Sequence, residues 1–122
     1  MRTYVHKATL LCVLFISPIA WAGNFAECIL SKMPGSANAA TSGAVYQTCS
    51  QDFPDRYAGV IRGSGKGLFG YKDGNACIIK KGKETSFQPA ASSIAVACRC
   101  LYDDPQFRGQ TCSDFFQQLN SR

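Results

Sequence analysis

The stretch Cys28–Cys49, which reads CILSKMPGSANAATSGAVYQTC, is the segment around which the chain is arranged, because a similar block follows it. A shift of 49 positions places its two cysteines on Cys77 and Cys98, whereas a shift of 51 places Cys49 on Cys100. Both alignments hold only with a two-residue insertion, and alanine and serine match easily by chance. The pattern therefore indicates either an internal repeat or two similar helices without a true repeat.

The N-terminal residues have the composition of a secretory signal peptide. Two basic residues precede the weakly polar to apolar run Ala8–Ile16, and Ala20-Trp21-Ala22 has the A-x-A pattern of a cleavage site. The run is shorter than the roughly 20 apolar residues that a helix needs to cross a bilayer. We therefore expect residues 1–22 to be removed, which leaves residues 23–122 as one domain without a transmembrane segment. The expected location is a bacterial periplasm or the extracellular space.

Six cysteines remain after this leader, an even number that is typical of a disulfide framework in a short exported chain. A zinc site is not indicated, because there is no C-x-x-C pair and the single histidine, His6, lies in the leader. We expect neither a metal nor a cofactor.

The block structure predicts how the cysteines pair. If the repeat is real, each block closes on itself, and the pairs are Cys28–Cys49, Cys77–Cys98 and Cys100–Cys112. On a helix, Cys98 and Cys100 point about 200° apart, which suits two different partners. The other register would pair Cys77 with Cys100. The first is favoured because Ile94, Cys98 and Leu101 share one helical stripe, which places Cys98 on the inner face.

Four helices are predicted from capping residues and apolar spacing. They are Asn24–Met33, a helix capped by Asn38 that runs to about Gln51, Gln88–Tyr102 and Ser113–Leu119. Pro34-Gly35 ends the first helix, and Pro89 lies in the first turn of the third, where a missing amide is harmless. Thr111 or Ser113 is expected to cap the fourth.

Between the two helical units lies a glycine-rich segment, residues 57–83, which holds seven of the eleven glycines. So many glycines argue against a helix. Leu68–Tyr71 and Ala76–Lys80, joined by a turn at Asp73-Gly74, predict a two-stranded β-hairpin. Cys77 would then attach a strand to the third helix. The predicted fold is a mainly α, small disulfide-rich domain, in which a Gly-rich β-hairpin separates two helical units.

The same segment carries most of the positive charge. Residues 62–83 hold six basic residues against Asp73 alone, and two aromatic residues lie among them. The predicted binding patch consists of Arg62, Lys66, Phe69, Tyr71, Lys72, Lys80, Lys81 and Lys83. Such a patch suits an acidic protein, a lipopolysaccharide or phospholipid headgroup, or nucleic acid, the last least because no nucleic-acid-binding motif is present. The competing interpretation is a solvated basic hairpin whose aromatic residues cover the helices.

Enzymatic activity is disfavoured. Without a histidine beyond the leader, there is no Ser-His or Cys-His nucleophile pair and no imidazole base. Glu27 with Asp52 or Asp55, or Asp103 with Asp104, remains as a carboxylate pair of the kind that serves glycoside hydrolysis. We expect an exported, non-catalytic binding protein, for example an inhibitor or immunity-type protein, that recognises an acidic protein or an envelope component. The alternatives are a secreted effector or hydrolase that uses carboxylates, and a structural envelope protein.

The segments CILSKM, AATSGAVYQTC, GLFGYKDGNACIIKK and AASSIAVACRCLYD resemble a class of small exported bacterial proteins. The shared patterns are C-I-L-x-[NK]-M and A-A-x-x-I-x-x-A-C-x-x-x-Y, and the resemblance extends over Cys28–Asp103. It implies export and a cysteine-bonded helical unit, and it carries over no functional site.

Overall fold

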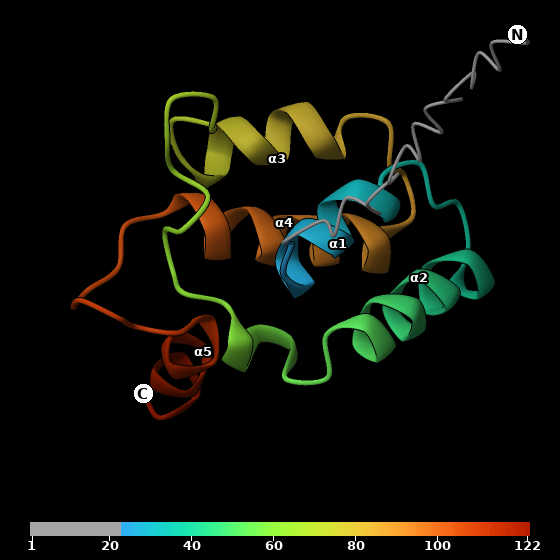
Figure 1. Cartoon of the computed structure of the whole chain (residues 1–122). Helices are drawn as coiled ribbons and strands as arrows, with labels where there is room; N and C mark the ends of the chain where they lie inside the picture. Colours follow the sequence, from blue (N-terminus) through green and yellow to red (C-terminus); the bar gives the residue numbers. More distant parts are fainter. Residues whose placement is uncertain (1–22) are drawn as a thin grey trace, which may run out of the picture.

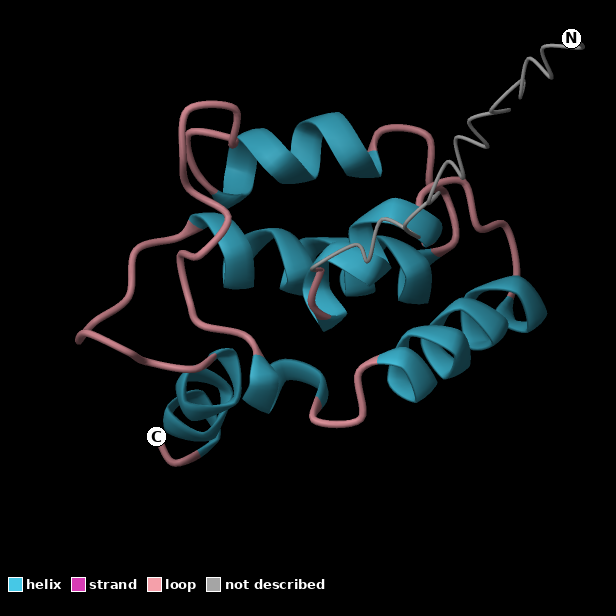
Figure 2. Ribbon diagram, in the orientation of Figure 1, coloured by secondary structure: helices cyan, strands magenta, loops and turns pink. Residues whose placement is uncertain are grey.

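The computed structural model describes residues 23–122, and in this part of the chain it contains helices and loops but no named strand (Figure 1, Figure 2). The elements are α1 (Phe25–Lys32), α2 (Ala39–Asp52), a short 3-10 helix η1 (Arg56–Gly59), α3 (Gly74–Gly82), α4 (Gln88–Tyr102) and α5 (Cys112–Asn120). The mainly helical prediction is confirmed. The predicted signal peptide and its cleavage site lie outside the described residues.

Side-chain caps set the first residues of several helices. At α1, Asn24 Oδ1 accepts a hydrogen bond from the Glu27 amide at 3.0 Å, and Glu27 Oε2 accepts one from the Asn24 amide at 3.2 Å. Thr111 and Asp114 form the same reciprocal arrangement at α5. Hydrogen bonding from the side chain and the backbone amide of Thr111 lowers the pKa of the Asp114 carboxyl. The four predicted helices are therefore present, and Thr111 is the cap of the last one.

The predicted β-hairpin is wrong. Residues 68–71 form turns, and α3 begins at Gly74 because Asp73 Oδ1 accepts a hydrogen bond from the Ala76 amide at 2.8 Å. Asp-Gly is a signal for a hairpin turn, but aspartate is equally a helix cap. Gly74 is required for another reason: a Cβ there would lie 3.0 Å from Arg99 Cα and 2.6 Å from Asp103 Oδ1. Cys77 consequently attaches a helix, and not a strand, to α4.

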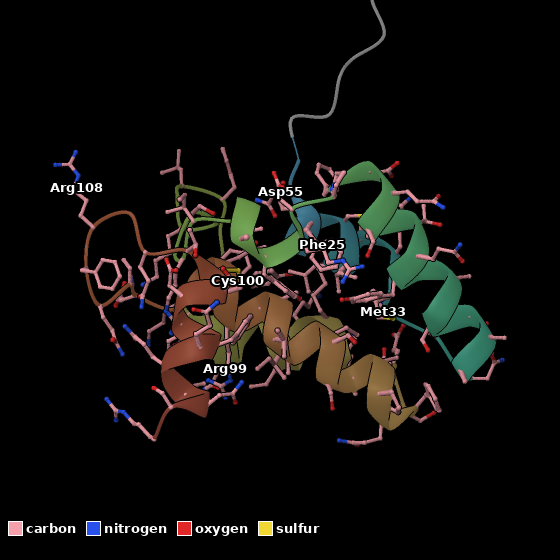
Figure 3. The ribbon with its side chains drawn as sticks, turned by 90° about the horizontal axis from the view of Figure 1, so that it is seen from below. Phe25, Met33, Asp55, Arg99, Cys100 and Arg108 are labelled. Atoms are coloured by element: carbon pink, nitrogen blue, oxygen red, sulfur yellow. A yellow bond between two sulfur atoms is a disulfide. The ribbon has the colours of Figure 1, made fainter. Side chains whose placement is uncertain are left out.

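Helix α4 is the centre of the domain, with α3 on one side and α1 on another (Figure 1). Its Ile94 and Leu101 are fully buried, and each contributes about 1.5–3 kcal/mol through removal from water. Phe25 of α1 and Met33, which follows α1 as its C-cap, also point into the interior, whereas Arg108 points away from the body of the domain (Figure 3). Helix α2 packs mainly against α1 and leaves most of its surface in solvent.

Three disulfides join the helices, and the predicted pairing is confirmed. Cys28–Cys49 joins α1 to α2, Cys77–Cys98 joins α3 to α4, and Cys100–Cys112 joins α4 to α5. The alternative pair of Cys77 with Cys100 is not formed. Cys98 and Cys100 are both fully buried and reach different helices, as their angular separation on α4 requires.

Helix α5 depends most on its disulfide. Besides Cys100–Cys112, it packs against η1, and residues 60–62 pair with residues 110–112 through the bridge between Ile61 and Thr111. We expect the double substitution of Cys100 and Cys112 by serine to lower the free energy of unfolding by about 3 kcal/mol, because it opens a short closed loop.

Hydrogen exchange should locate that effect. Amides of residues 107–122 should exchange faster, while those of α1, α3 and α4 stay protected. The matched control is the double serine variant of Cys28 and Cys49, which should loosen α1 and α2 instead. Uniform loss of protection in the first variant would contradict a separable C-terminal unit.

Tyr57 links η1 to α1 and α5. Its ring packs edge-on against Phe25 and Phe116, with ring centroids 4.9 and 5.4 Å away. Burial raises the pKa of the Tyr57 hydroxyl well above its ordinary value, and Tyr46 adds to the shift. Because the folded state holds this proton more tightly, its stabilising effect is present below pH 10 and is lost as the pH rises above that value.

We therefore expect the thermal midpoint to fall above about pH 10, the usual range of tyrosine ionisation. Tyr57→Phe keeps the ring contacts and should reduce this alkaline loss. Burial also raises the pKa of Tyr102, so some of the dependence should remain. Tyr46→Phe removes only the smaller contribution to the Tyr57 shift and should reduce the alkaline loss less than Tyr57→Phe does. An identical alkaline profile for native and Tyr57→Phe protein would refute the assignment.

Candidate functional site: the lysine face of α3 and the loop before it

The structure separates the eight residues of the predicted patch by their exposure. Arg62 is buried, and Tyr71 and Lys81 are half-buried. The remaining five are exposed, and they are Lys66, Phe69, Lys72, Lys80 and Lys83. The patch is therefore divided between the interior and the surface.

Arg62 is part of the folded framework. It is 8% exposed, and its guanidinium carbon lies 3.6 Å from the centroid of the Phe115 ring. Its Nε donates a hydrogen bond to the Asp104 carbonyl at 3.1 Å, and its Nη2 lies 3.8 Å from Asp103 Oδ2. Burial lowers the pKa of Arg62, and Asp103 opposes that shift. Arg62 thus ties the loop to α5 and to the end of α4, and it offers little surface to a partner.

Lys66 and Tyr71 hold the loop against the end of α4. The ammonium of Lys66 pairs with the exposed carboxylate of Asp104, a contact that stabilises an exposed site only slightly. The Tyr71 ring packs edge-on against Tyr102, with centroids 5.1 Å apart. Tyr71 is consequently a packing residue, as the competing interpretation of the patch expected for its aromatic residues.

The lysines of α3 lie on different sides of the helix. At 100° per residue, Ala76, Ile79 and Lys83 share one side, with Lys80 at its edge. Lys81 falls on the opposite side, next to the buried Cys77, and is half-buried. We call the exposed set Lys72, Ile79, Lys80 and Lys83 the lysine face. Ile79 is 73% exposed, so this face is basic but not wholly polar.

The loop before α3 contains two adjacent exposed apolar residues, Leu68 and Phe69, which are 93% and 99% exposed. We call this pair the loop tip. The sequence analysis included Phe69 in the predicted binding patch but placed Leu68 in a strand without a binding role. The signal that identifies the pair is its position between Gly67 and Gly70, since two large apolar residues enclosed by glycines have few local neighbours to cover them.

Three of the carboxylates considered for catalysis line two hollows on the surface. Glu27 and Asp52 line one of about 770 Å³, and Asp52 and Asp55 line another of about 210 Å³. All three side chains are exposed, and Glu27 already accepts a hydrogen bond from the Asn24 amide. The exposure of these side chains and the use of Glu27 as a helix cap give no support to hydrolysis.

A third hollow, of about 640 Å³, lies between α2 and the start of α4. Its wall includes Ser42, Ser50 and Ser93, with Tyr46 and Arg56 at one end. The Arg56 guanidinium carbon lies 5.4 Å from the Tyr46 ring centroid, and Arg56 has a φ of 48°. Sequence reasoning did not identify this hollow, because no local pattern predicts that α2 stands away from α4.

Within residues 23–122, no cluster of three or more histidine, cysteine or acidic side chains is placed to hold a metal ion. In the same part of the chain, none of the helices has the length and apolar character needed to cross a membrane. Comparison with known proteins gives no match to a family model, a curated protein or a solved structure.

The role of Glu27 can be tested directly. Glu27→Ala removes half of the capping box and should lower the free energy of unfolding by about 0.5–1 kcal/mol, whereas Glu27→Gln keeps an acceptor and should stay close to the native value. Thermal denaturation checks both variants. If Glu27 were catalytic, the glutamine variant would keep its stability but lose turnover. That result would support the alternative function of a hydrolase that uses carboxylates.

Proposed function

We propose that this chain is an exported, non-catalytic binding protein that recognises an anionic component of the cell envelope through the lysine face. The observation that carries the proposal is the division of the cations in this region. Arg62 and Arg99 both contact Asp103, and Lys66 pairs with Asp104. Among the described residues, Lys72 and Lys80 form no ion pair, so their charges are free to meet a partner.

Lys83 adds to this set with only a weak internal competitor. Its ammonium lies 3.9 Å from Glu84 Oε1, and both side chains are largely exposed. An exposed pair of this kind is worth little, and an external anion can displace it. Of the other nearby acids, Asp73 caps α3, and Asp103 and Asp104 face Arg62, Arg99 and Lys66. The outer side of α3 is consequently a cationic surface.

Export is part of the proposal. Three disulfides in a chain of this size are compatible with an oxidising compartment, where such bonds form and persist. The leader pattern of residues 1–22 and the resemblance to small exported bacterial proteins support the same location. An acidic protein of the envelope and an anionic lipid or lipopolysaccharide all remain within the proposed class of partner.

The binding test is affinity capture from a total envelope extract. The native oxidised protein is compared, at low and high salt, with the variant Lys72→Gln/Lys80→Gln/Lys83→Gln. We expect the native protein to retain a partner at low salt and to release it at high salt, because screening weakens contacts between exposed charges. The variant should retain much less of it while unfolding at nearly the native temperature.

The matched control removes the same amount of charge elsewhere. Lys32→Gln/Arg108→Gln/Arg122→Gln neutralises three exposed residues outside the lysine face. This control should capture the partner as the native protein does. Equal capture by the native protein and the lysine-face variant would refute the proposal, and equal losses in both variants would mean that only net charge matters.

A further inference from the structure

The loop tip exposes more apolar surface than the fold requires. Leu68 and Phe69 are adjacent, large and almost wholly in solvent, and the next most exposed large apolar side chain is Ile79 of the lysine face. Single exposed apolar residues are normal on protein surfaces, whereas a contiguous exposed group marks a site of interaction. The loop that carries the tip leads directly into α3 (Figure 1), which carries most of the lysine face.

Backbone contacts with α4 brace the loop beneath the tip. The Gly65 amide donates a hydrogen bond to the Leu101 carbonyl at 2.9 Å. A Cβ at Gly65 would lie 2.8 Å from the Tyr102 ring, and a Cβ at Gly70 would lie 2.4 Å from the Gly65 carbonyl oxygen. These approaches are possible only without side chains at the two glycines. The tip is therefore presented outward by a closely packed base.

Lysines lie on both sides of the tip in the sequence. Lys66 and Lys72 flank it in sequence, and Lys80 and Lys83 continue along α3. In Figure 1, the loop before α3 lies at the start of that helix, and the two together form one edge of the domain. A lysine stem can lie along apolar surface while its ammonium stays among polar groups. This combination of apolar apex and basic surroundings is the one that binds a bilayer interface.

The shape and the type of cation favour a bilayer over a folded protein. None of the three hollows described above is lined by residues 60–83, so this region presents exposed side chains to a partner and no wall of those hollows. Arginine suits paired recognition of one carboxylate, whereas lysine is a point charge that suits the diffuse field of anionic lipids. The unpaired or weakly paired cations of this region are all lysines, because Arg62 and Arg99 contact Asp103.

We infer that the anionic component is a lipid bilayer surface, and that Leu68 and Phe69 insert at its headgroup boundary while Lys72, Lys80 and Lys83 contact anionic headgroups. This inference rests on the proposed function and specifies its partner. Insertion of the tip removes both apolar side chains from water, and the lysines supply attraction that depends on salt and on lipid charge.

The test is flotation of the oxidised protein with two kinds of vesicle, one containing phosphatidylglycerol and phosphatidylethanolamine and the other phosphatidylcholine alone. The native protein should float with the anionic vesicles and not with the neutral ones. Leu68→Ser/Phe69→Ser should lower the partition coefficient about tenfold or more. The matched control is Phe107→Ser/Leu119→Ser, which removes the same pair of side-chain types from half-exposed positions outside the region and should float as the native protein does.

The depth at which the loop tip inserts into the bilayer is measured with a tryptophan placed at the tip. In the Phe69→Trp variant of the protein that begins at Gly23, the only indole lies at the tip, since Trp21, the single tryptophan of the chain, belongs to the expected leader. Its emission should shift to the blue on anionic vesicles and be quenched by brominated acyl chains. Emission unchanged by vesicles, or equal flotation of the native protein and the tip variant, would overturn insertion.

Two results separate this inference from the proposed function. If the native protein ignores anionic vesicles but still captures an extract component through the lysine face, the bilayer is excluded and the partner is an acidic protein or another envelope anion. If both assays show no dependence on the lysine face, the proposed function and the inference fail together. Flotation with phosphatidylcholine equal to that with phosphatidylglycerol would overturn the role of the headgroup charge.

Discussion

The two disulfides that leave opposite sides of α4 are the constraint on which the rest of the structure depends. Cys98 and Cys100 are separated by about 200° on the helix, so one bond holds α3 and the other holds α5. Both attached helices have nine residues, a length at which an isolated helix is marginal in water. Their helical state therefore relies on attachment to the longer, buried α4.

This attachment also decides the use of the charges. With α3 held against α4 through Cys77, Lys81 faces the interior side, and Lys80 and Lys83 face outward. At the C-terminal end of α4, Asp103 pairs with Arg62 and Arg99. In this region, Arg62 and Arg99 consequently make internal contacts, whereas Lys72, Lys80 and Lys83 remain at the surface. Stability and the proposed binding thus depend on different cations, which makes the two separable by mutation.

Much of the fold could be predicted because its signals are local. Asn24, Asn38 and Thr111 cap helices through residues three positions away, and the 49-residue shift correctly pairs Cys28 with Cys49 and Cys77 with Cys98. The starts of α1 and α3, and those of α2 and α4, are also 49 residues apart. The shift of 49 therefore aligns α3 with α1, whereas the glycines and the Asp-Gly signal predicted a hairpin there. The hairpin was wrong because Asp73 serves as a helix cap and Gly74 as a close contact with α4.

The sequence by itself determined the four helices predicted above and favoured the observed cysteine pairs, since these depend on neighbouring residues or on a repeated spacing. Only the tertiary structure decided which members of the basic segment reach solvent. Arg62 is buried because Asp103, Asp104 and Phe115, far along the chain, surround it. Leu68 and Phe69 are exposed because the loop below them is packed against the end of α4, leaving no interior position for its apex. Such exposure depends on contacts between distant residues, and no local pattern encodes it.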